Sequence, residues 1–181
     1  SIPNIKSIYI NSIFRPLPIF SMNLGGRLSK YSAYEEVLID PRIAFKYNPI
    51  SDLAIKLSWG NFSQFLYTTN QEEELLRIVD FWQPIPNGQK PQQSEHYILG
   101  AEYWISSGNT ISIETYYKKY LHLYDLNPLL DPSDVQNTIA VSGIGDAYGL
   151  ELLYRMNINN ISGWIGYAFS DIVREVDFNS D

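Results

Sequence analysis

Apolar and polar residues alternate along about eight stretches of this chain, and short and long connections join the stretches in turn. Since successive side chains of a β-strand point to opposite faces, the alternation predicts strands with one apolar and one polar face. Four connections are tight, at 15–18, 48–52, 106–109 and 156–160, and four are long, at about 31–37, 66–93, 121–146 and from 170 onward. Short turns at one end and long loops at the other are typical of transmembrane β-barrels of the bacterial outer membrane.

The alternation divides the side chains of each stretch between two faces. In residues 111–117, Ile111, Ile113 and Tyr117 fall on one face, while Ser112 and Glu114 fall on the other. One face therefore suits lipid and the other suits water. We expect charges in mid-strand on the polar face only, at Arg27, Arg42, Lys46, Lys56, Glu102, Glu114, Lys118, Glu151 and Arg155.

Strand length separates a membrane-crossing sheet from a soluble sandwich. The alternating stretches run for ~9–13 residues, which matches a tilted membrane-crossing strand and exceeds the usual five or six residues of a sandwich. We therefore expect an all-β, antiparallel up-and-down meander of about eight long strands that forms a segment of a transmembrane β-barrel. A soluble sandwich with a solvated polar face stays open as an alternative.

Composition favours an amphipathic surface and excludes some partners. Aromatic residues make up 14% of the chain, with 14 Tyr and 4 Trp, and charged residues only 18%. Tyr and Trp combine an apolar ring with a polar tip, which suits membrane interfaces. The net charge of -7 argues against nucleic acid as a partner, because no concentrated basic patch is visible. Without cysteine there is no disulfide framework and no cysteine-ligated metal site.

The long connection at 66–93 contains the one helix that the sequence predicts. Asn70 can cap its first turn, and carboxylates at 72–74 favour the positive end of the helix dipole. Pro84 and Pro86 would end it. Its apolar stripe comprises Leu75, Leu76, Val79 and Phe81.

No catalytic or metal-binding motif stands out. His96 and His122 belong to no HExxH motif and have no partner at metal-ligand spacing. The carboxylate runs at 35–36 and 72–74 are neighbours in sequence, whereas paired catalytic carboxylates oppose each other across a cleft. We therefore expect no enzymatic activity, no metal and no cofactor.

Several short segments occur in an informative order. They are 40–43 (DPRI), 53–65 (LAIKLSWGNFSQF), 90–97 (KPQQSEHY), 101–103 (AEY), 114–119 (ETYYKK) and 147–151 (AYGLE). Through these segments nearly the whole chain resembles the middle of the barrel of TonB-dependent outer-membrane receptors. The resemblance implies active import of a scarce nutrient, such as a ferric siderophore or cobalamin, across the bacterial outer membrane. It also implies three kinds of partner, namely outer-membrane lipid, the TonB complex and a small-molecule or metal-chelate ligand.

Members of that family hold a folded plug inside a barrel of about 22 strands, and TonB pulls on a motif near the N-terminus. In residues 1–181 we see neither the plug, nor the TonB motif, nor a barrel-closing C-terminal strand that ends in an aromatic residue. We therefore expect the chain to be a partial receptor barrel. TonB would act through the missing N-terminal part.

If the chain is part of a receptor, ligand contacts would come from loop tips and from lumen-facing residues near the loop end. The candidates are Gln64, Trp82, Tyr120, His122, Tyr124 and Asp125. Interface aromatics and ordinary loop residues are the alternative interpretation of this set.

Two other function classes stay open. A soluble or surface-exposed all-β module could recognise glycans through its aromatic residues. A small outer-membrane barrel acting as a lipid-modifying enzyme would need a Ser or His constellation near one rim, and neither His has an evident Ser and Asp arrangement beside it.

Overall fold

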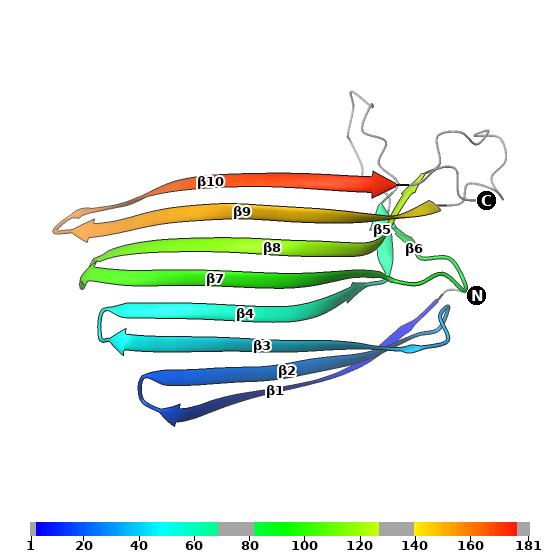
Figure 1. The fold of residues 1–181 in the computed structure, drawn as a ribbon, viewed down its shortest axis with the longest axis horizontal. Coiled ribbons are helices and arrows are strands. Elements are labelled where there is room, and N and C mark those ends of the chain that lie inside the picture. The colour runs from blue at the N-terminus through cyan, green and yellow to red at the C-terminus, as the bar shows by residue number, and fades with distance from the viewer. Residues whose placement is uncertain (1–2, 69–81, 127–139, 177–181) are drawn as a thin grey trace.

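The computed structural model describes residues 3–68, 82–126 and 140–176, with the side chains of 125, 126, 140–142 and 176 excepted (Figure 1). In this part of the chain one large antiparallel sheet contains eight strands, and a small sheet contains two. The strands of the large sheet are β1 (Ile5–Leu17), β2 (Phe20–Tyr31), β3 (Val37–Ile50), β4 (Leu53–Gln64), β7 (Gln92–Ser106), β8 (Asn109–Leu126), β9 (Ala140–Ile158) and β10 (Ile161–Val176). The small sheet consists of β5 (Leu66–Thr68) and β6 (Trp82–Pro84).

The large sheet is an up-and-down meander. Each strand pairs antiparallel with the next one along the chain, and β4 pairs directly with β7 because β5 and β6 form their own sheet. The predicted antiparallel meander is thus confirmed. The helix predicted at 70–81 lies outside the described residues. In the described part of the chain, no helix is long and apolar enough to cross a membrane.

Short turns join the strands at one end of the sheet, as predicted. The β7–β8 turn lies between Ser106 and Asn109, where it was expected, and the other turns lie within a few residues of the predicted positions. The β9–β10 turn contains Asn159 at φ 54, and asparagine is one of the few residues that tolerate this left-handed conformation. The first strand continues to Leu17, into the connection predicted at 15–18.

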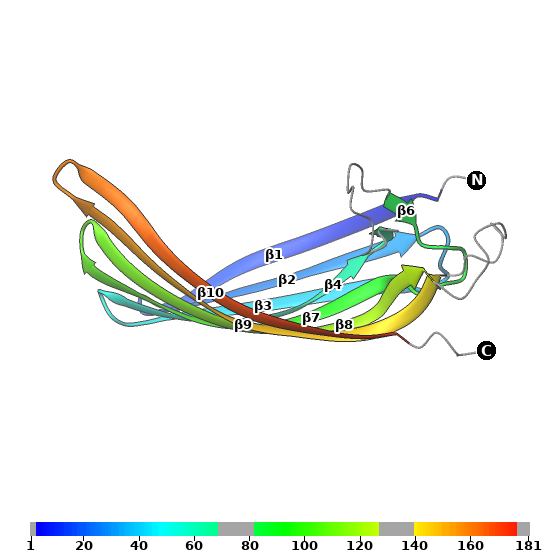
Figure 2. The same ribbon diagram turned by 90° about the horizontal axis from the view of Figure 1, so that it is seen from above.

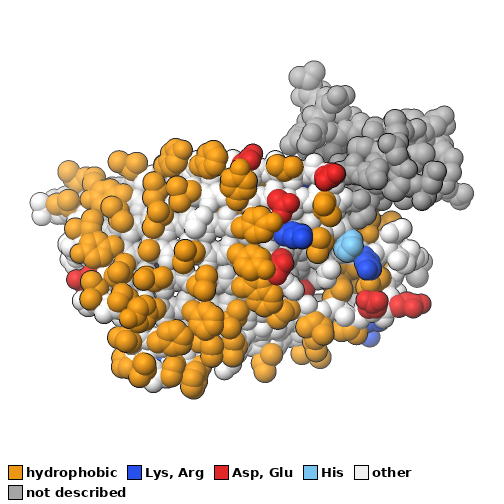
Figure 3. All heavy atoms as spheres, viewed as in Figure 1, with side chains coloured by type: hydrophobic (Ala, Val, Ile, Leu, Met, Phe, Trp, Pro, Cys, Tyr) orange, Lys and Arg blue, Asp and Glu red, His pale blue; other side chains and the backbone are white. Residues whose placement is uncertain are grey.

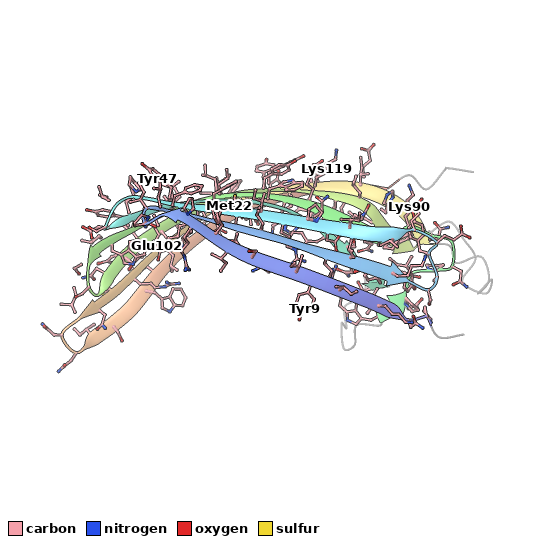
Figure 4. The ribbon with its side chains drawn as sticks, turned by 90° about the horizontal axis from the view of Figure 1, so that it is seen from below. Tyr9, Met22, Tyr47, Lys90, Glu102 and Lys119 are labelled. Atoms are coloured by element: carbon pink, nitrogen blue, oxygen red, sulfur yellow. The ribbon has the colours of Figure 1, made fainter. Side chains whose placement is uncertain are left out.

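The sheet is strongly curved. Figure 2 shows a trough whose concave side holds the small β5–β6 sheet at the loop end. Figure 3 views the opposite, convex side, which hydrophobic side chains cover at the short-turn end. Figure 4 shows Tyr47 and Lys119 projecting from the convex face, and Tyr9 and Glu102 projecting from the concave face. These two faces are the ones that the alternation predicts.

Among the described residues, a packed hydrophobic core is found only at the loop end. We call this core the loop-end cluster: Tyr31, Leu38, Phe65, Tyr67, Ile85 and Tyr124. Along the rest of the sheet, large hydrophobic side chains are exposed, with Ile8 at 76% and Ile165 at 74%. A soluble sandwich would bury this apolar face against a second sheet, which the described residues do not provide.

Candidate functional site

One row of aromatic residues crosses the convex face. Trp59, Tyr97, Tyr117 and Tyr148 are cross-strand partners on four adjacent strands, β4, β7, β8 and β9. On the short-turn side of this aromatic row, β4 and β7 bear exposed apolar side chains such as Ile55, Leu57 and Leu99. Aromatic rings flank the apolar band of membrane barrels at its boundary with water, so the aromatic row has the position of such a boundary.

The polar tips of the aromatic row all bond to carboxylates. The Trp59 Nε1–H and the Tyr97 hydroxyl donate to Glu95 Oε1 at 2.8 and 2.7 Å. The Tyr117 hydroxyl donates to Asp146, and the Tyr148 hydroxyl donates to Asp171 at 2.8 Å. The ring of each residue can thus lie against lipid while its polar atom is satisfied at the wet side.

Charges on the convex face begin at the aromatic row, where Asp171 is the cross-strand partner of Tyr148. Glu95, Lys119 and Asp146 are cross-strand partners in the next row toward the loops. The expectation that charges fall on one face only is therefore wrong for this end of the strands. It holds within the apolar band, because these convex charges lie in the aromatic row or on its loop side, where Figure 3 shows acidic and basic side chains together.

The concave face is polar, and its charges are segregated. One row places Lys46 opposite Lys56 and Glu114 opposite Glu151, with Gly100 between the two pairs. Like charges directly opposite each other destabilise a sheet. Lys56 finds a partner in a neighbouring row, since its Nζ lies 2.6 Å from Oε2 of Glu102.

A buried ion pair ties three strands together near the loop end. The Arg27 guanidinium contacts Asp40 Oδ2 at 2.7 Å, and the side chain of Asp40 is completely buried. Arg27 also donates to the carbonyl oxygen of Ser63, whose hydroxyl donates to Asp40 Oδ1 at 2.6 Å. Described β3–β4 pairing ends at Arg42 and Gly60, so this network joins the two strands where their ladder stops.

Aromatic rings and a cation lie side by side on the concave face. The Arg42 guanidinium carbon lies 4.5 Å from the centre of the Phe62 ring, and the rings of Phe62 and His96 are also 4.5 Å apart. The Tyr120 ring meets His96 edge to face at 6.4 Å. Tyr120 is one of the six ligand candidates predicted from the sequence, whereas Arg42, Phe62 and His96 are not among them. They come together because their positions on three neighbouring strands are in register, which sequence spacing alone does not reveal.

The loop-end cluster holds the described residues 65–68 and 82–91 over the concave face. The Tyr31 hydroxyl donates to the carbonyl oxygen of Ile85 at 2.7 Å, and the Tyr124 hydroxyl donates to that of Lys90 at 2.6 Å. The amide of Gly88, at φ +79, donates to the carbonyl oxygen of Ala33 at 2.8 Å. Burial raises the pKa of the Tyr67 phenol above its usual 10.0, so this ring packs in its neutral form.

The six predicted ligand-binding residues lie on β4, β6 and β8. Trp82 is exposed on β6, and the Gln64 side chain donates to the carbonyl oxygen of Leu66. Tyr124 is 5% exposed and packs on Tyr67 in the loop-end cluster. The other three lie on β8. Tyr120 lies beside His96, and His122 lies at an irregularity in the β8–β9 ladder with φ 56. The backbone of Asp125 pairs with that of Val141 near the end of the strand.

Among the described residues, no three His, Asp or Glu side chains gather closely enough to hold a metal ion. The described residues instead form one curved sheet with an apolar convex face, a polar concave face and a small second sheet at the loop end.

Residues 4–181 match the family model of the TonB-dependent receptor-like β-barrel. The chain belongs to the TonB-dependent receptor family. No curated protein sequence matches the chain. The family match confirms the resemblance drawn from the sequence segments, and the matched residues cover nearly the entire chain.

Three solved structures are similar in fold. The FrpB iron transporter from Neisseria meningitidis has a TM-score of 0.71 and 14% identity, and the match covers 96% of this chain and 26% of FrpB. The siderophore receptor PirA from Pseudomonas aeruginosa has a TM-score of 0.73 and 12% identity, covering 96% and 35%. The alcaligin outer-membrane receptor FauA from Bordetella pertussis has a TM-score of 0.63 and 15% identity, covering 96% and 30%. This chain therefore spans only about a quarter to a third of those proteins.

Proposed function

We propose that the chain is part of an outer-membrane, TonB-dependent active transporter that imports a scarce nutrient such as a ferric siderophore or cobalamin. The observation that carries the proposal is the division of one continuous sheet into a lipid-compatible convex face and a polar concave face, in a chain of this receptor family. The similar structures are those of an iron transporter, a siderophore receptor and an alcaligin receptor, and this similarity supports a metal-chelate cargo. The same family membership favours a receptor over an enzyme.

We also propose that residues 1–181 form one wall of a larger barrel whose lumen is filled by a plug domain outside this chain. Within the described residues the two outer strands, β1 and β10, are paired on one side only, and all their described residues except the half-buried Gly163 are exposed. Further strands would satisfy those edges. The Glu114 and Glu151 pair supports the plug, because basic groups of a lumen-filling domain would relieve the repulsion between the two carboxylates.

The six ligand candidates remain a proposal. Tyr120 and Trp82 are the members that the geometry favours, since Tyr120 continues the aromatic surface of the concave face and Trp82 is 58% exposed on the folded segment at the rim. Replacement of all six by Ala in the full receptor should weaken ligand binding. Unchanged affinity would exclude the set.

The transport proposal is tested by deleting the gene for the full protein and supplying radiolabelled ferric siderophores and cobalamin one at a time. We expect uptake of at least one compound to be lost, to return with the intact gene, and to stay absent from cells that lack TonB. If neither deletion changes the uptake of any tested compound, active import by this protein is refuted.

The rival soluble glycan-binding module makes a different prediction about the native polypeptide. A receptor would appear in the outer-membrane fraction as a chain roughly three to five times longer, enough for a plug and about 22 strands. A free-standing product of this length that needs no detergent would favour the module. The mass of the native protein in each cell fraction decides between them.

A further inference from the structure

A hollow of ≈ 280 Å³ opens on the concave face around Arg42. Its floor is one row of cross-strand partners: Asn11, Gly25, Arg42, Gly60 and His96. A glycine thus lies on each side of Arg42, so side chains with functional groups alternate with positions that have none. This alternation creates the depth of the hollow.

The two glycines are needed for the positions of their neighbours. A Cβ on Gly60 would lie 3.0 Å from Arg42 Cγ and 3.3 Å from the Pro41 carbonyl oxygen. A Cβ on Gly25 would lie 2.8 Å from Asn11 Oδ1. Arg42 therefore extends across Gly60 to reach the Phe62 ring, and Asn11 extends across Gly25. The adjacent Gly26 is different, because its Cβ would meet nothing closer than 4.0 Å.

The charge of Arg42 is not balanced by the described residues. Within them, the salt bridges are Arg27 with Asp40 and Lys56 with Glu102, and no carboxylate lies within 4.0 Å of Arg42. Its guanidinium lies against Phe62, which leaves the N–H groups at its edge available. The hollow also contains Asn23, whose buried Oδ1 has no hydrogen-bond partner in the described structure.

We propose that the Arg42 hollow binds a planar carboxylate that also carries a hydroxyl or N–H donor. The carboxylate would accept paired N–H bonds from Arg42, and an adjoining ring would extend the stack of Phe62 and His96. The donor would satisfy Asn23 Oδ1. The volume lies below the roughly 300–1,000 Å³ of pockets for drug-sized ligands, so the hollow fits a group the size of a benzoate rather than a large chelate.

This inference rests on the proposed function, because the concave face lines a lumen only in a closed barrel. The carboxylate can belong to a free solute or to an acidic side chain from the rest of the receptor. Both sources share the same chemistry at Arg42, and the experiment separates them.

The probe is 4-fluoro-3-hydroxybenzoate, observed by fluorine NMR line broadening with the full receptor in detergent micelles. If the source is a free solute, the wild type should broaden the probe signal and should not broaden that of the neutral 4-fluoro-3-hydroxybenzamide. Arg42→Met should weaken binding about tenfold, as expected for a lost charge-assisted bond. Lys46→Met removes a concave-face cation outside the hollow and should leave binding unchanged.

If an acidic side chain of the receptor already occupies the hollow, the wild type will not bind the probe. Arg42→Met should then lower the thermal midpoint of the receptor, whereas Lys46→Met should not. Absence of probe binding together with equal midpoints for the two variants would overturn the proposal.

Gly60→Ala provides a second variant that keeps the charge, in case Arg42→Met fails to fold. It should displace Arg42 and reproduce the effect of Arg42→Met, while Gly26→Ala should behave as the wild type. Uptake assays on the same strains keep the two proposals separate. A wild type that imports nothing contradicts the transport proposal, whatever the probe does.

Discussion

The two faces of the large sheet are made by the same strands, yet they obey opposite rules. On the convex face the apolar side chains are large and exposed, and the charges of the described strands lie in the aromatic row, as Asp171 does, or on its loop side. On the concave face charges occur along the strands, and glycines allow long side chains to lie flat across their neighbours. The difference teaches that neither face is a core in the usual sense. Each has the composition that suits a surrounding medium, lipid for the convex face and water for the concave face.

The largest expected effect comes from placing a charge in the apolar band. Ile113→Arg should destabilise the full receptor in phospholipid vesicles by about 2–4 kcal/mol, because the cation would have to leave water at this depth. Ser112→Arg is the matched control, because Ser112 lies on the polar concave face and its cross-strand partner Glu102 carries the opposite charge. Denaturant unfolding measures both variants. Equal losses of stability would mean that the convex face does not lie in lipid.

A smaller effect is expected from filling a glycine position of the concave face. A Cβ on Gly149 would lie 2.6 Å from the Phe169 carbonyl oxygen and 2.6 Å from the Tyr116 ring. Gly149→Ala should therefore cost about 1–3 kcal/mol of unfolding free energy. In Gly163→Ala the new methyl meets nothing closer than 3.9 Å, and its unfolding midpoint should stay near that of the wild type. A stable Gly149→Ala variant would show that Tyr116 moves aside freely.

Substitutions in the loop-end cluster should weaken the local packing of this region and have a smaller effect on stability. Tyr31→Phe removes the buried hydroxyl that donates to the Ile85 carbonyl oxygen, and we expect a loss of about 1 kcal/mol. Tyr67→Phe loses only a long 3.4 Å contact with Gln83 and should cost less. Hydrogen exchange at the Ile85 amide, which bonds to the Phe65 carbonyl oxygen, reports the opening of this segment. Faster exchange in the Tyr67 variant than in the Tyr31 variant would contradict this ranking.

The smallest effect is expected in the aromatic row. Tyr148→Phe removes an exposed bond to Asp171 and should lower the stability less than the variants above, because water replaces the lost partner. Tyr167→Phe, on the convex face of β10, is a control without a protein hydrogen bond among the described residues. Vesicle unfolding curves compare the two. A larger loss for Tyr167→Phe would mean that the carboxylate bonds do not fix the tyrosine tips.

The strand order and the two faces could be predicted because both are encoded locally. Alternation assigns Tyr97, Leu99 and Tyr103 to one face without any knowledge of their neighbours, and a misplaced turn of a few residues does not alter this division. The family could be recognised for a similar reason, since its short segments follow one another along the strands.

The loop-end cluster, the β5–β6 sheet and the hollow around Arg42 could not be predicted, because they depend on contacts between residues that are distant in sequence. Tyr31 and Ile85, or Tyr124 and Lys90, come together only after the sheet has formed, so the loop-end cluster and the β5–β6 sheet were missed. The hollow around Arg42 likewise needs the register of five strands. Tyr124 appeared in sequence as a loop aromatic available to a ligand, whereas its ring is packed inside the cluster.

The way in which the segment 82–91 is held has a consequence for how this protein can change over time. The hydroxyls of Tyr31 and Tyr124 donate to the main-chain oxygens of Ile85 and Lys90, and these two bonds do not involve the side chains of Ile85 and Lys90. Every residue type carries that main-chain oxygen, proline and glycine included. Substitutions along the exposed side of the segment therefore leave its anchorage intact, and the rim can alter what it displays to the outside while the path of the chain is preserved.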